Sequence, residues 1–387
     1  MLWLTVSAAL HMLKSITMFP TKPEEYAKHP VPSSEEWHQL WATWDIVTRK
    51  MIPEKQLLDK PIKLRNACIF YLGHIPTFFD MKLTEATGGK PTEPSYFYNI
   101  FERGIDPDVD NPEQCHAHSE IPDEWPELDL ILTFQDRVRQ RVKRLYESGQ
   151  AYNDAWTGRA LWLGFEHEIM HMETLLYMLL QSEWAQPPAI AAKPDFEQLA
   201  AEAHRKAVEN EWFDVPTQSI TIGLDDPDTA EGPVRHFGWD VETPPRTVKV
   251  GAMKVKGRPI TNGEYARYLH ATGNKQIPAS WTLPEAAADA DGANGANGAN
   301  GYMNGDSDLL DFVHNKGVRT MYGPVPLKYA LDWPMSASYD ELSGCAQYMG
   351  GRIPTLEEAR SIYYYADGLK KKEASKSLGK TIPAVNG

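Results

Sequence analysis

Apolar side chains in the N-terminal half of the chain recur every three or four residues, a spacing typical of amphipathic helices. This spacing predicts four long helices, over about 33–52, 62–87, 128–148 and 157–181. We expect Pro76 to kink or break the second helix just after His74, because proline cannot donate a helical hydrogen bond. The proline-rich stretch 88–126 predicts a long loop with one short helix. Four apolar-faced helices with one long connection indicate an antiparallel bundle.

The pattern changes after Trp212, where polar and β-branched residues alternate and glycine or proline separates the short runs. Such alternation is typical of β-strands. The preceding stretch, 186–211, is rich in alanine and glutamate and predicts a connector with another helix. The triplet Ala-Asn-Gly occurs three times in 293–301, so we expect 286–308 to be a disordered insertion. A domain boundary is therefore expected near residue 212.

Composition and charge narrow the class of protein. Of the 387 residues, 42% are hydrophobic and 24% are charged, which is the globular range. The net charge of −14 disfavours nucleic acid and anionic membranes as partners, because both are negatively charged. Three widely spaced cysteines favour a reducing compartment, so we expect a cytoplasmic protein. The apolar segment 1–19 contains His11 and Lys14, so a signal peptide or membrane span is the less favoured interpretation.

The sharpest local motif is the segment 165–173, Phe-Glu-His-Glu-Ile-Met-His-Met-Glu. His167 and His171 are four residues apart on a predicted helix, so both side chains project from one face and can bind one metal ion. Glu173 falls nearly on the opposite face and is expected to have a structural role. If the second and fourth helices face each other, His74 can supply a third imidazole.

Three interpretations of this motif stay open. Histidines on the inner face of a helix are often core residues with internal hydrogen bonds. His167 and His171 also fit the H-E-x-x-H motif of zincin metalloproteases, with Glu168 as general base, although the longer zincin patterns fit poorly. The third interpretation is a non-protease metal site completed by His74, because three imidazoles without cysteine suit Fe(II), Zn(II) or Cu(II). Glu168 and Met170 flank the histidine face and could line a pocket.

Longer motifs resemble a known family. Tyr71-Leu-Gly-His74 and the segment 166–174 resemble the DinB-like domain of the non-haem iron sulfoxide synthases of ergothioneine biosynthesis. The segment 101–126 resembles the fungal members in particular. The second half resembles the sulfatase-modifying-factor domain, which is shared with formylglycine-generating enzymes, through the motifs at 220–223, 242–245, 260–265, 333–338 and 351–355. The resemblance covers about 30–365.

The resemblance implies an α + (α+β) fold class. A DinB-like four-helix bundle is expected to precede an incomplete, C-type-lectin-like sulfatase-modifying-factor domain. The implied parts are an N-terminal extension at 1–29, the bundle at 30–185, a helical linker at 186–211, and the second domain at 212–387 with its insertion at 286–308.

The resemblance also implies an activity. His74, His167 and His171 would hold Fe(II) as a three-histidine facial triad. The family joins cysteine or γ-glutamylcysteine to C2 of hercynine, using dioxygen, and produces a sulfoxide. An ovothiol-type synthase, which joins cysteine to C5 of histidine, is the nearest alternative, and a non-catalytic or hydrolytic DinB-like metal protein is the other. His74 discriminates between a sulfoxide synthase and a hydrolytic metal protein, because the synthase requires His74 and a zincin does not.

The chain departs from the resembled family at both ends. Fungal members usually carry an N-terminal methyltransferase domain, which this sequence lacks. The family's second domain also continues beyond the Gly-Arg-Ile-Pro-Thr motif, where it supplies an active-site tyrosine and substrate-binding residues, whereas this chain ends at Gly387. We therefore expect the catalytic tyrosine to lie beyond the C-terminus, and a truncated chain that binds iron but turns over poorly.

Overall fold

The computed structural model describes residues 29–63, 65–102, 105–107, 115–117, 122–189, 191–226, 234–283 and 307–376. The expected N-terminal extension, except His29, and the expected insertion, except its last two residues, lie outside these ranges. The described chain forms two compact units. The helical unit contains the described residues up to 192 together with 225–226 and 234–243, and the mixed unit contains the others.

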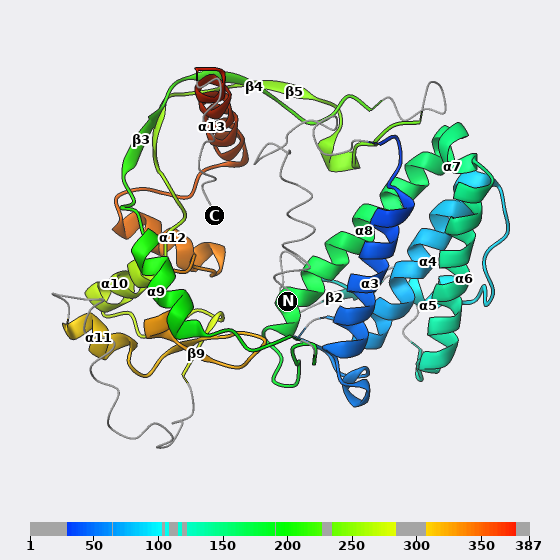
Figure 1. The fold of residues 1–387 in the computed structure, drawn as a ribbon, viewed down its shortest axis with the longest axis horizontal. Helices are drawn as coiled ribbons and strands as arrows, with labels where there is room; N and C mark the ends of the chain where they lie inside the picture. Colours follow the sequence, from blue (N-terminus) through cyan, green and yellow to red (C-terminus); the bar gives the residue numbers. More distant parts are fainter. Residues whose placement is uncertain are drawn as a thin grey trace. The chain divides into compact units, whose positions relative to one another are not determined.

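Four long helices make up most of the helical unit (Figure 1). They are α3 (Ser34–Lys50), α4 (Cys68–Thr87), α6 (Leu128–Glu147) and α8 (Ala155–Leu179). α4 packs against both α6 and α8, and α3 packs against α8. The connections contain η1 (Glu54–Gln56), α5 (Phe97–Phe101), the paired strands β1 (Ile105–Pro107) and β2 (Cys115–Ala117), and α7 (Gln150–Asn153). Each predicted long helix therefore has an observed counterpart.

Local sequence signals explain where several of these helices begin. At the start of α3, Ser33 accepts a hydrogen bond from the backbone N–H of Glu36, and the Glu36 carboxylate accepts one from the backbone N–H of Ser33. This capping box satisfies two N–H groups that the helix cannot pair internally. Asp154 caps α8 in a similar way. Trp37 and Trp44 of α3 are fully buried, so the face predicted to be apolar is the packed face.

The second helix differs from the prediction. α4 begins at Cys68 rather than near residue 62, and it continues through Pro76 to Thr87 without a break. Proline removes only one donor from the helical ladder. Nearly every residue from Cys68 to Thr77 is buried against neighbouring helices, and this packing outweighs the local cost of proline.

The two units do not meet at the boundary expected from the sequence. The strands of the mixed unit begin at Trp212, as predicted, but this unit already starts at 193 and includes α9 (Phe196–Lys206). The segment 234–243, which contains η2 (Asp240–Glu242), packs with the helical unit although it follows two strands of the mixed unit. The assignment of the chain to the family domains named above stays a prediction.

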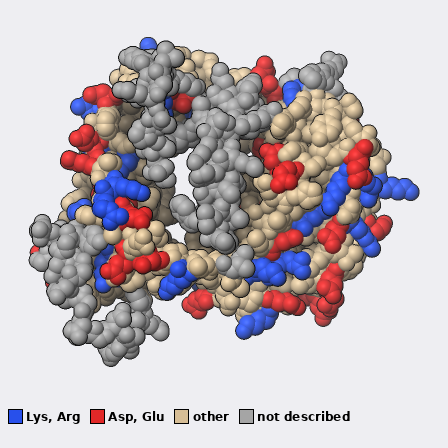
Figure 2. Space-filling view, in the orientation of Figure 1, with Lys and Arg blue, Asp and Glu red and all other residues tan. Residues whose placement is uncertain are grey.

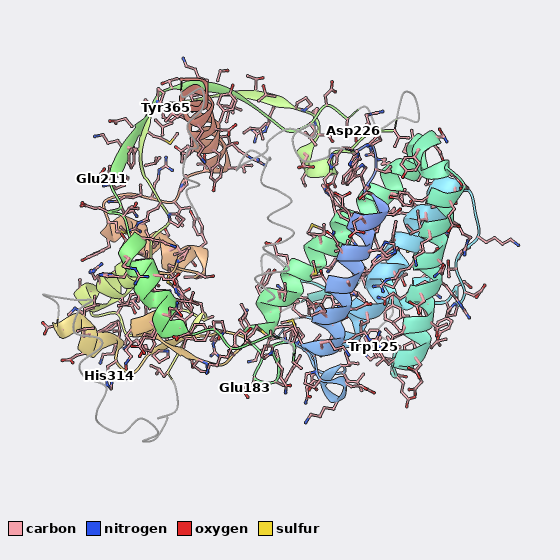
Figure 3. The ribbon with its side chains drawn as sticks, in the orientation of Figure 1. Trp125, Glu183, Glu211, Asp226, His314 and Tyr365 are labelled. Atoms are coloured by element: carbon pink, nitrogen blue, oxygen red, sulfur yellow. The ribbon has the colours of Figure 1, made fainter. Side chains whose placement is uncertain are left out.

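Side-chain contacts fasten this returning segment to α8. Glu166 accepts hydrogen bonds from His236 at 2.6 Å and from the Trp239 indole at 2.8 Å. Arg159, near the start of α8, pairs with Asp226, which is labelled in Figure 3. These partners lie more than sixty residues apart in the sequence, so local patterns carry no sign of the contact.

The mixed unit combines short strands with helices. Its remaining elements are β3 (Trp212–Val215), β4 (Gln218–Ile222), β5 (Arg246–Val250), β6 (Met253–Lys256), α10 (Asn262–Thr272), β7 (Trp281–Thr282), α11 (Ser307–Val313), β8 (Gly317–Val318), β9 (Val325–Pro326), η4 (Leu327–Tyr329), α12 (Tyr339–Tyr348) and α13 (Leu356–Lys376). β3 pairs with β6 and β4 with β5, both antiparallel, and β7, β8 and β9 form an antiparallel sheet in that order.

One buried amide organises the core of the mixed unit. The Asn262 side chain donates to the Ala330 carbonyl and accepts from the Trp281 indole, both at 2.9 Å. Trp281 and Tyr265 are fully buried in the surrounding apolar cluster, as is Cys345. Asn262 thus starts α10 and joins it to two other parts of the unit, which is a structural role.

Charged side chains of both signs are interspersed over the helical unit on the face shown in Figure 2. Ion pairs of the helical unit include Arg139 with Asp45 and the buried pair of Arg141 with Asp80. Among the described helices, none combines the length and the apolar character that crossing a membrane requires.

Candidate metal centre

Three histidines from two helices converge in the helical unit. His74 lies on α4, and His167 and His171 lie one turn apart on α8. Their candidate ligand atoms all lie within 4.8 Å of one another, and Nε2 of His74 is 3.3 Å from Nε2 of His171. The three residues singled out from the sequence are therefore brought together, and they can hold a single metal ion.

Two glycines allow the close approach that brings these histidines together. A Cβ atom on Gly164 of α8 would lie 2.3 Å from the ring of Phe79 on α4. A Cβ atom on Gly73 of α4 would lie 2.4 Å from the ring of Phe101. No side chain larger than hydrogen fits at either position without displacing an aromatic ring.

Burial keeps the three imidazoles neutral. It lowers the pKa of His74 to about 4, although the hydrogen bond to the Phe101 carbonyl acts in the opposite direction. Burial and then the neighbouring His74 lower the pKa of His171 to about 3. Burial, followed by the two other histidines, holds the pKa of His167 well below its usual value. Because the neutral imidazole is the form that binds metals, all three are ready to ligate at neutral pH.

The outer nitrogens of the three rings differ in their partners. His74 Nδ1 donates to the Phe101 carbonyl oxygen at 2.7 Å, which leaves the lone pair on Nε2 for a ligand. Among the described residues, neither Nδ1 of His167 nor Nδ1 of His171 has a hydrogen-bond partner, although both are buried. Buried polar atoms without partners are rare in folded proteins and call for an explanation. Three neutral imidazole nitrogens whose ligand atoms lie within 4.8 Å of one another suit a borderline metal ion.

The histidines open onto a cavity of about 460 Å³. Aromatic rings form its inner wall: Phe78 stacks on His167 at 3.9 Å between ring centroids, and Phe70 stacks on His74 at 5.0 Å. Charged and polar side chains complete the lining, among them Arg65, Asn66, Lys82, Glu85 and Glu102. This size and mixture are typical of pockets for small polar molecules.

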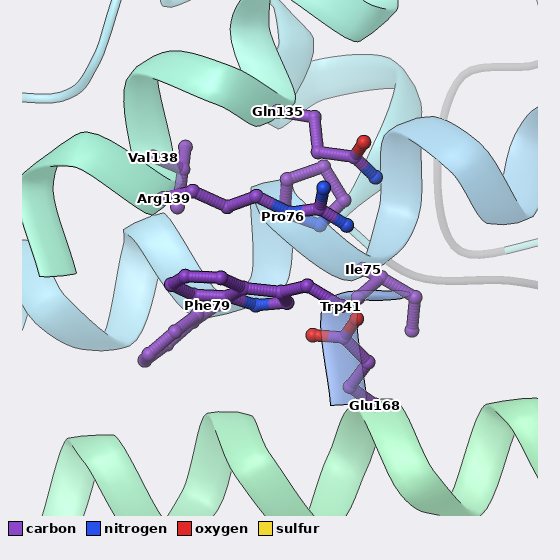
Figure 4. A pocket seen from close by; sticks show the side chains of 8 residues that line it. All are labelled: Trp41, Ile75, Pro76, Phe79, Gln135, Val138, Arg139 and Glu168. Atoms are coloured by element: carbon purple, nitrogen blue, oxygen red, sulfur yellow. The ribbon is translucent and has the colours of Figure 1, made fainter. Parts of the chain in front are cut away.

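Glu168 does not belong to this cavity. It lines a separate cavity of about 10 Å³ with Trp41 and Arg139 (Figure 4), and burial raises its pKa to about 8. Met170 is half exposed and lines neither cavity. Glu168 thus lines a pocket, but not the one onto which the histidines open, and a zincin-like role for Glu168 as general base loses its geometric basis.

Sequence reasoning missed the surroundings of the histidines. The carbonyl of Phe101 belongs to the backbone, so the residue type at position 101 does not predict its hydrogen bond with His74. The hydrogen bonds from His236 and Trp239 to Glu166, directly before His167, come from a segment beyond the expected domain boundary. The motif Arg-His-Phe-Gly-Trp at 235–239 is rich in aromatic residues and was the available signal.

Comparisons with known proteins agree with this geometry. Residues 34–175, which include all three histidines, match the DinB superfamily. Ergothioneine biosynthesis protein 1 of Neurospora crassa is 56% identical over 381 residues, which cover 97% of this chain and 44% of that protein. The Schizosaccharomyces pombe protein of the same name is 30% identical over 355 residues, which cover 86% of this chain and 42% of that protein. This chain thus spans less than half the length of both relatives. As the motifs predicted, the chain contains a DinB-superfamily domain and is similar over nearly its whole length to ergothioneine biosynthesis proteins.

Proposed function

We propose that the chain carries the iron site of a sulfoxide synthase of ergothioneine biosynthesis, which joins cysteine or γ-glutamylcysteine to C2 of hercynine. The observation that supports this most directly is the convergence of His74, His167 and His171 on one cavity. The similarity to proteins named for ergothioneine biosynthesis supports the pathway. We assign the helical unit as a DinB-like four-helix bundle and the mixed unit as a sulfatase-modifying-factor-like domain, on the resemblance of their motifs.

The donor set suits the proposed metal. Three imidazole nitrogens on one side of an ion leave positions open, as in other non-haem iron sites with few protein ligands. When bound, Fe(II) would supply the redox chemistry that activates the thiol and dioxygen. The overall reaction balances as thiol plus hercynine plus dioxygen giving the sulfoxide and water. One oxygen atom goes to sulfur, and the other leaves with the thiol hydrogen and the C2 hydrogen.

The cavity walls have the chemistry that such substrates need. The rings of Phe70 and Phe78 keep water away from the imidazoles on which they stack. Arg65 and Lys82 line the cavity and can attract the carboxylates of amino-acid substrates, and Glu102 can attract an ammonium group. Holding the thiol and the imidazole substrate together in one pocket makes their reaction effectively intramolecular.

Anaerobic loading with Fe(II) tests the metal site. We expect one iron per wild-type chain and loss of iron in His74→Ala, His167→Ala and His171→Ala. His38→Ala is the matched control, because His38 is exposed on α3 of the same unit. Retention of iron in His74→Ala, or a preference for zinc that depends only on His167 and His171, would contradict the proposal and favour a hydrolytic or structural site.

An oxygen-dependent assay tests the reaction. Iron-loaded chain is mixed with either thiol, dioxygen and hercynine or, in a parallel reaction, histidine, and the products are identified by mass spectrometry. A sulfoxide bonded at C2 of hercynine supports the proposal. A product bonded at C5 of histidine would instead identify the ovothiol-type reaction.

A further inference from the structure

A second buried polar cluster lies on the helix that carries His74. Asp80 is fully buried on α4, and both of its carboxylate oxygens are used. Oδ1 accepts from the Thr92 hydroxyl at 2.6 Å and from Arg141 at 2.7 Å. Oδ2 accepts from the Thr92 backbone N–H at 2.7 Å and from the Tyr98 hydroxyl at 2.8 Å. We call Asp80, Thr92, Tyr98 and Arg141 the Asp80 cluster.

The Asp80 cluster fixes the segment 92–98 against two helices. Thr92 and Tyr98 lie at the two ends of this segment, and both bind the same carboxylate on α4. Arg141 comes from α6 and also donates to Thr84 of α4 at 2.8 Å. A charged group with four hydrogen bonds in a buried site holds its neighbours in one geometry.

The same segment leads directly to the metal centre. Tyr98 lies in α5, and Phe101, one turn later, ends that helix. Phe101 is fully buried, its ring fills the space above Gly73, and its carbonyl accepts the hydrogen bond from His74 Nδ1. Asp80 and His74 are thus joined twice, once through α4 and once through the segment 92–101.

From this arrangement we propose that Asp80 is a positioning residue for the metal centre. By holding the segment 92–98 on α4, it sets the place of the Phe101 carbonyl, which in turn orients the His74 imidazole. Partners of a ligating histidine that fix its ring and tautomer commonly change metal affinity by about 10- to 100-fold. Asp80 itself does not line the histidine cavity, so it acts only through this chain of contacts. The inference rests on the proposed metal site but not on the proposed reaction.

Binding of Co(II) to the full chain tests the proposal, because Co(II) reports its coordination geometry in its visible absorption. Asp80→Asn is expected to weaken Co(II) binding about 10-fold and to shift the absorption bands. Tyr98→Phe removes one of the four hydrogen bonds and keeps the ring, so a smaller weakening of about 3-fold is expected. Asp45→Asn is the control, because the ion pair of Asp45 with Arg139 joins α3 to α6 and includes no residue of the Asp80 cluster or of α5.

The outcomes separate a positioning role from a structural one. If Asp80→Asn and Tyr98→Phe lower the melting temperature but bind Co(II) with wild-type affinity and absorption, the proposal is overturned. If Asp80→Asn does not fold, Tyr98→Phe and Thr92→Val decide by the same criterion. His74→Ala is measured in parallel. If it also binds Co(II) normally, the metal site itself fails, whereas loss in His74→Ala with normal binding in the Asp80-cluster variants overturns only this inference.

Discussion

The histidine cluster and the Asp80 cluster lie on the same helix, and both are buried, yet they differ in how completely their polar atoms are paired. The Asp80 carboxylate accepts four hydrogen bonds, and its charge is balanced by Arg141. In the histidine cluster, the buried Nδ1 atoms of His167 and His171 have no partner among the described residues.

This difference teaches how to distinguish structural from functional polar groups in this protein. A buried polar group costs free energy unless it is paired, so a fully paired cluster contributes to the fold without any ligand. In the histidine cluster, Nε2 of His74 and Nε2 of His171 face each other at 3.3 Å, and a metal ion bound there would stabilise the folded chain. Mutation of the Asp80 cluster should therefore lower the free energy of unfolding, whereas metal bound to the histidine cluster should raise it.

The largest expected effect is the loss of the Asp80 carboxylate. Asp80→Ala leaves Arg141 unpaired in a buried site and deprives Thr92 and Tyr98 of their acceptor. We expect the free energy of unfolding to fall by about 3–5 kcal/mol, measured by urea denaturation at pH 7. Asp45→Ala, which breaks a more exposed pair with Arg139, should cost no more than about 1 kcal/mol. Equal losses in the two variants would erase the contrast between a fully buried cluster and a partly exposed pair.

Metal should stabilise the chain through the histidine cluster. At a free Co(II) concentration of 100 times Kd, the free energy of unfolding should rise by about 2.7 kcal/mol, because metal binds the folded state. Removal of Co(II) with a chelator should reverse the increase. The free energy of unfolding of His171→Ala should not rise with Co(II). Thermal unfolding with and without metal measures the effect in the wild type and in the variant. An equal increase in His171→Ala would place the metal elsewhere.

The contact between α4 and Phe101 gives the next effect. Gly73→Ala places a methyl group within 2.4 Å of the Phe101 ring, so we expect a loss of about 1–3 kcal/mol from overpacking and weaker Co(II) binding. Gly368→Ala in α13 is the matched control, because nothing lies within 4 Å of its added Cβ atom. There alanine should be neutral or stabilise by up to about 1 kcal/mol, as expected from helix propensity. A stabilised Gly73→Ala chain would show that Phe101 moves freely.

The smallest effect concerns a paired carboxylate in the mixed unit. Burial would raise the pKa of Glu264, but hydrogen bonds from Arg258 and from the Thr261 backbone outweigh it and hold this pKa below its usual value. The stabilisation is therefore present above the ordinary glutamate pKa and is lost as the pH falls through the lower, folded-state value.

Glu264→Gln should accordingly cost about 1 kcal/mol at pH 7, and the difference from wild type should vanish on acidification. Urea denaturation at several pH values measures this difference. Asp214→Asn, which alters an exposed pair with Lys254 at 3.9 Å, should change little at any pH. If the free energies of unfolding of Glu264→Gln and wild type still differ in acid, the charge of the Glu264 carboxylate is not the cause of the difference.

Much of the helical unit follows from local patterns. The three- and four-residue spacing located α3, α6 and α8 to within a few residues, and Ser33 signalled the start of α3. These predictions succeed because helix periodicity and capping depend on residues within one or two turns. The helix α4 has no break at Pro76, because burial along that helix is a tertiary effect that outweighs local propensity.

The sequence by itself determined the ligand types: a histidine pair at helical spacing, a third histidine in a glycine-containing motif, and a resemblance that the comparisons bear out. Only the tertiary structure decided that α4 faces α8 at the histidines, that Glu168 lies in another cavity, and that the Phe101 carbonyl binds His74. The physical reason is the distance along the sequence over which each property is determined. Side-chain chemistry and helix periodicity are local properties, whereas burial, hydrogen-bond partners and pKa shifts depend on residues far away in the sequence.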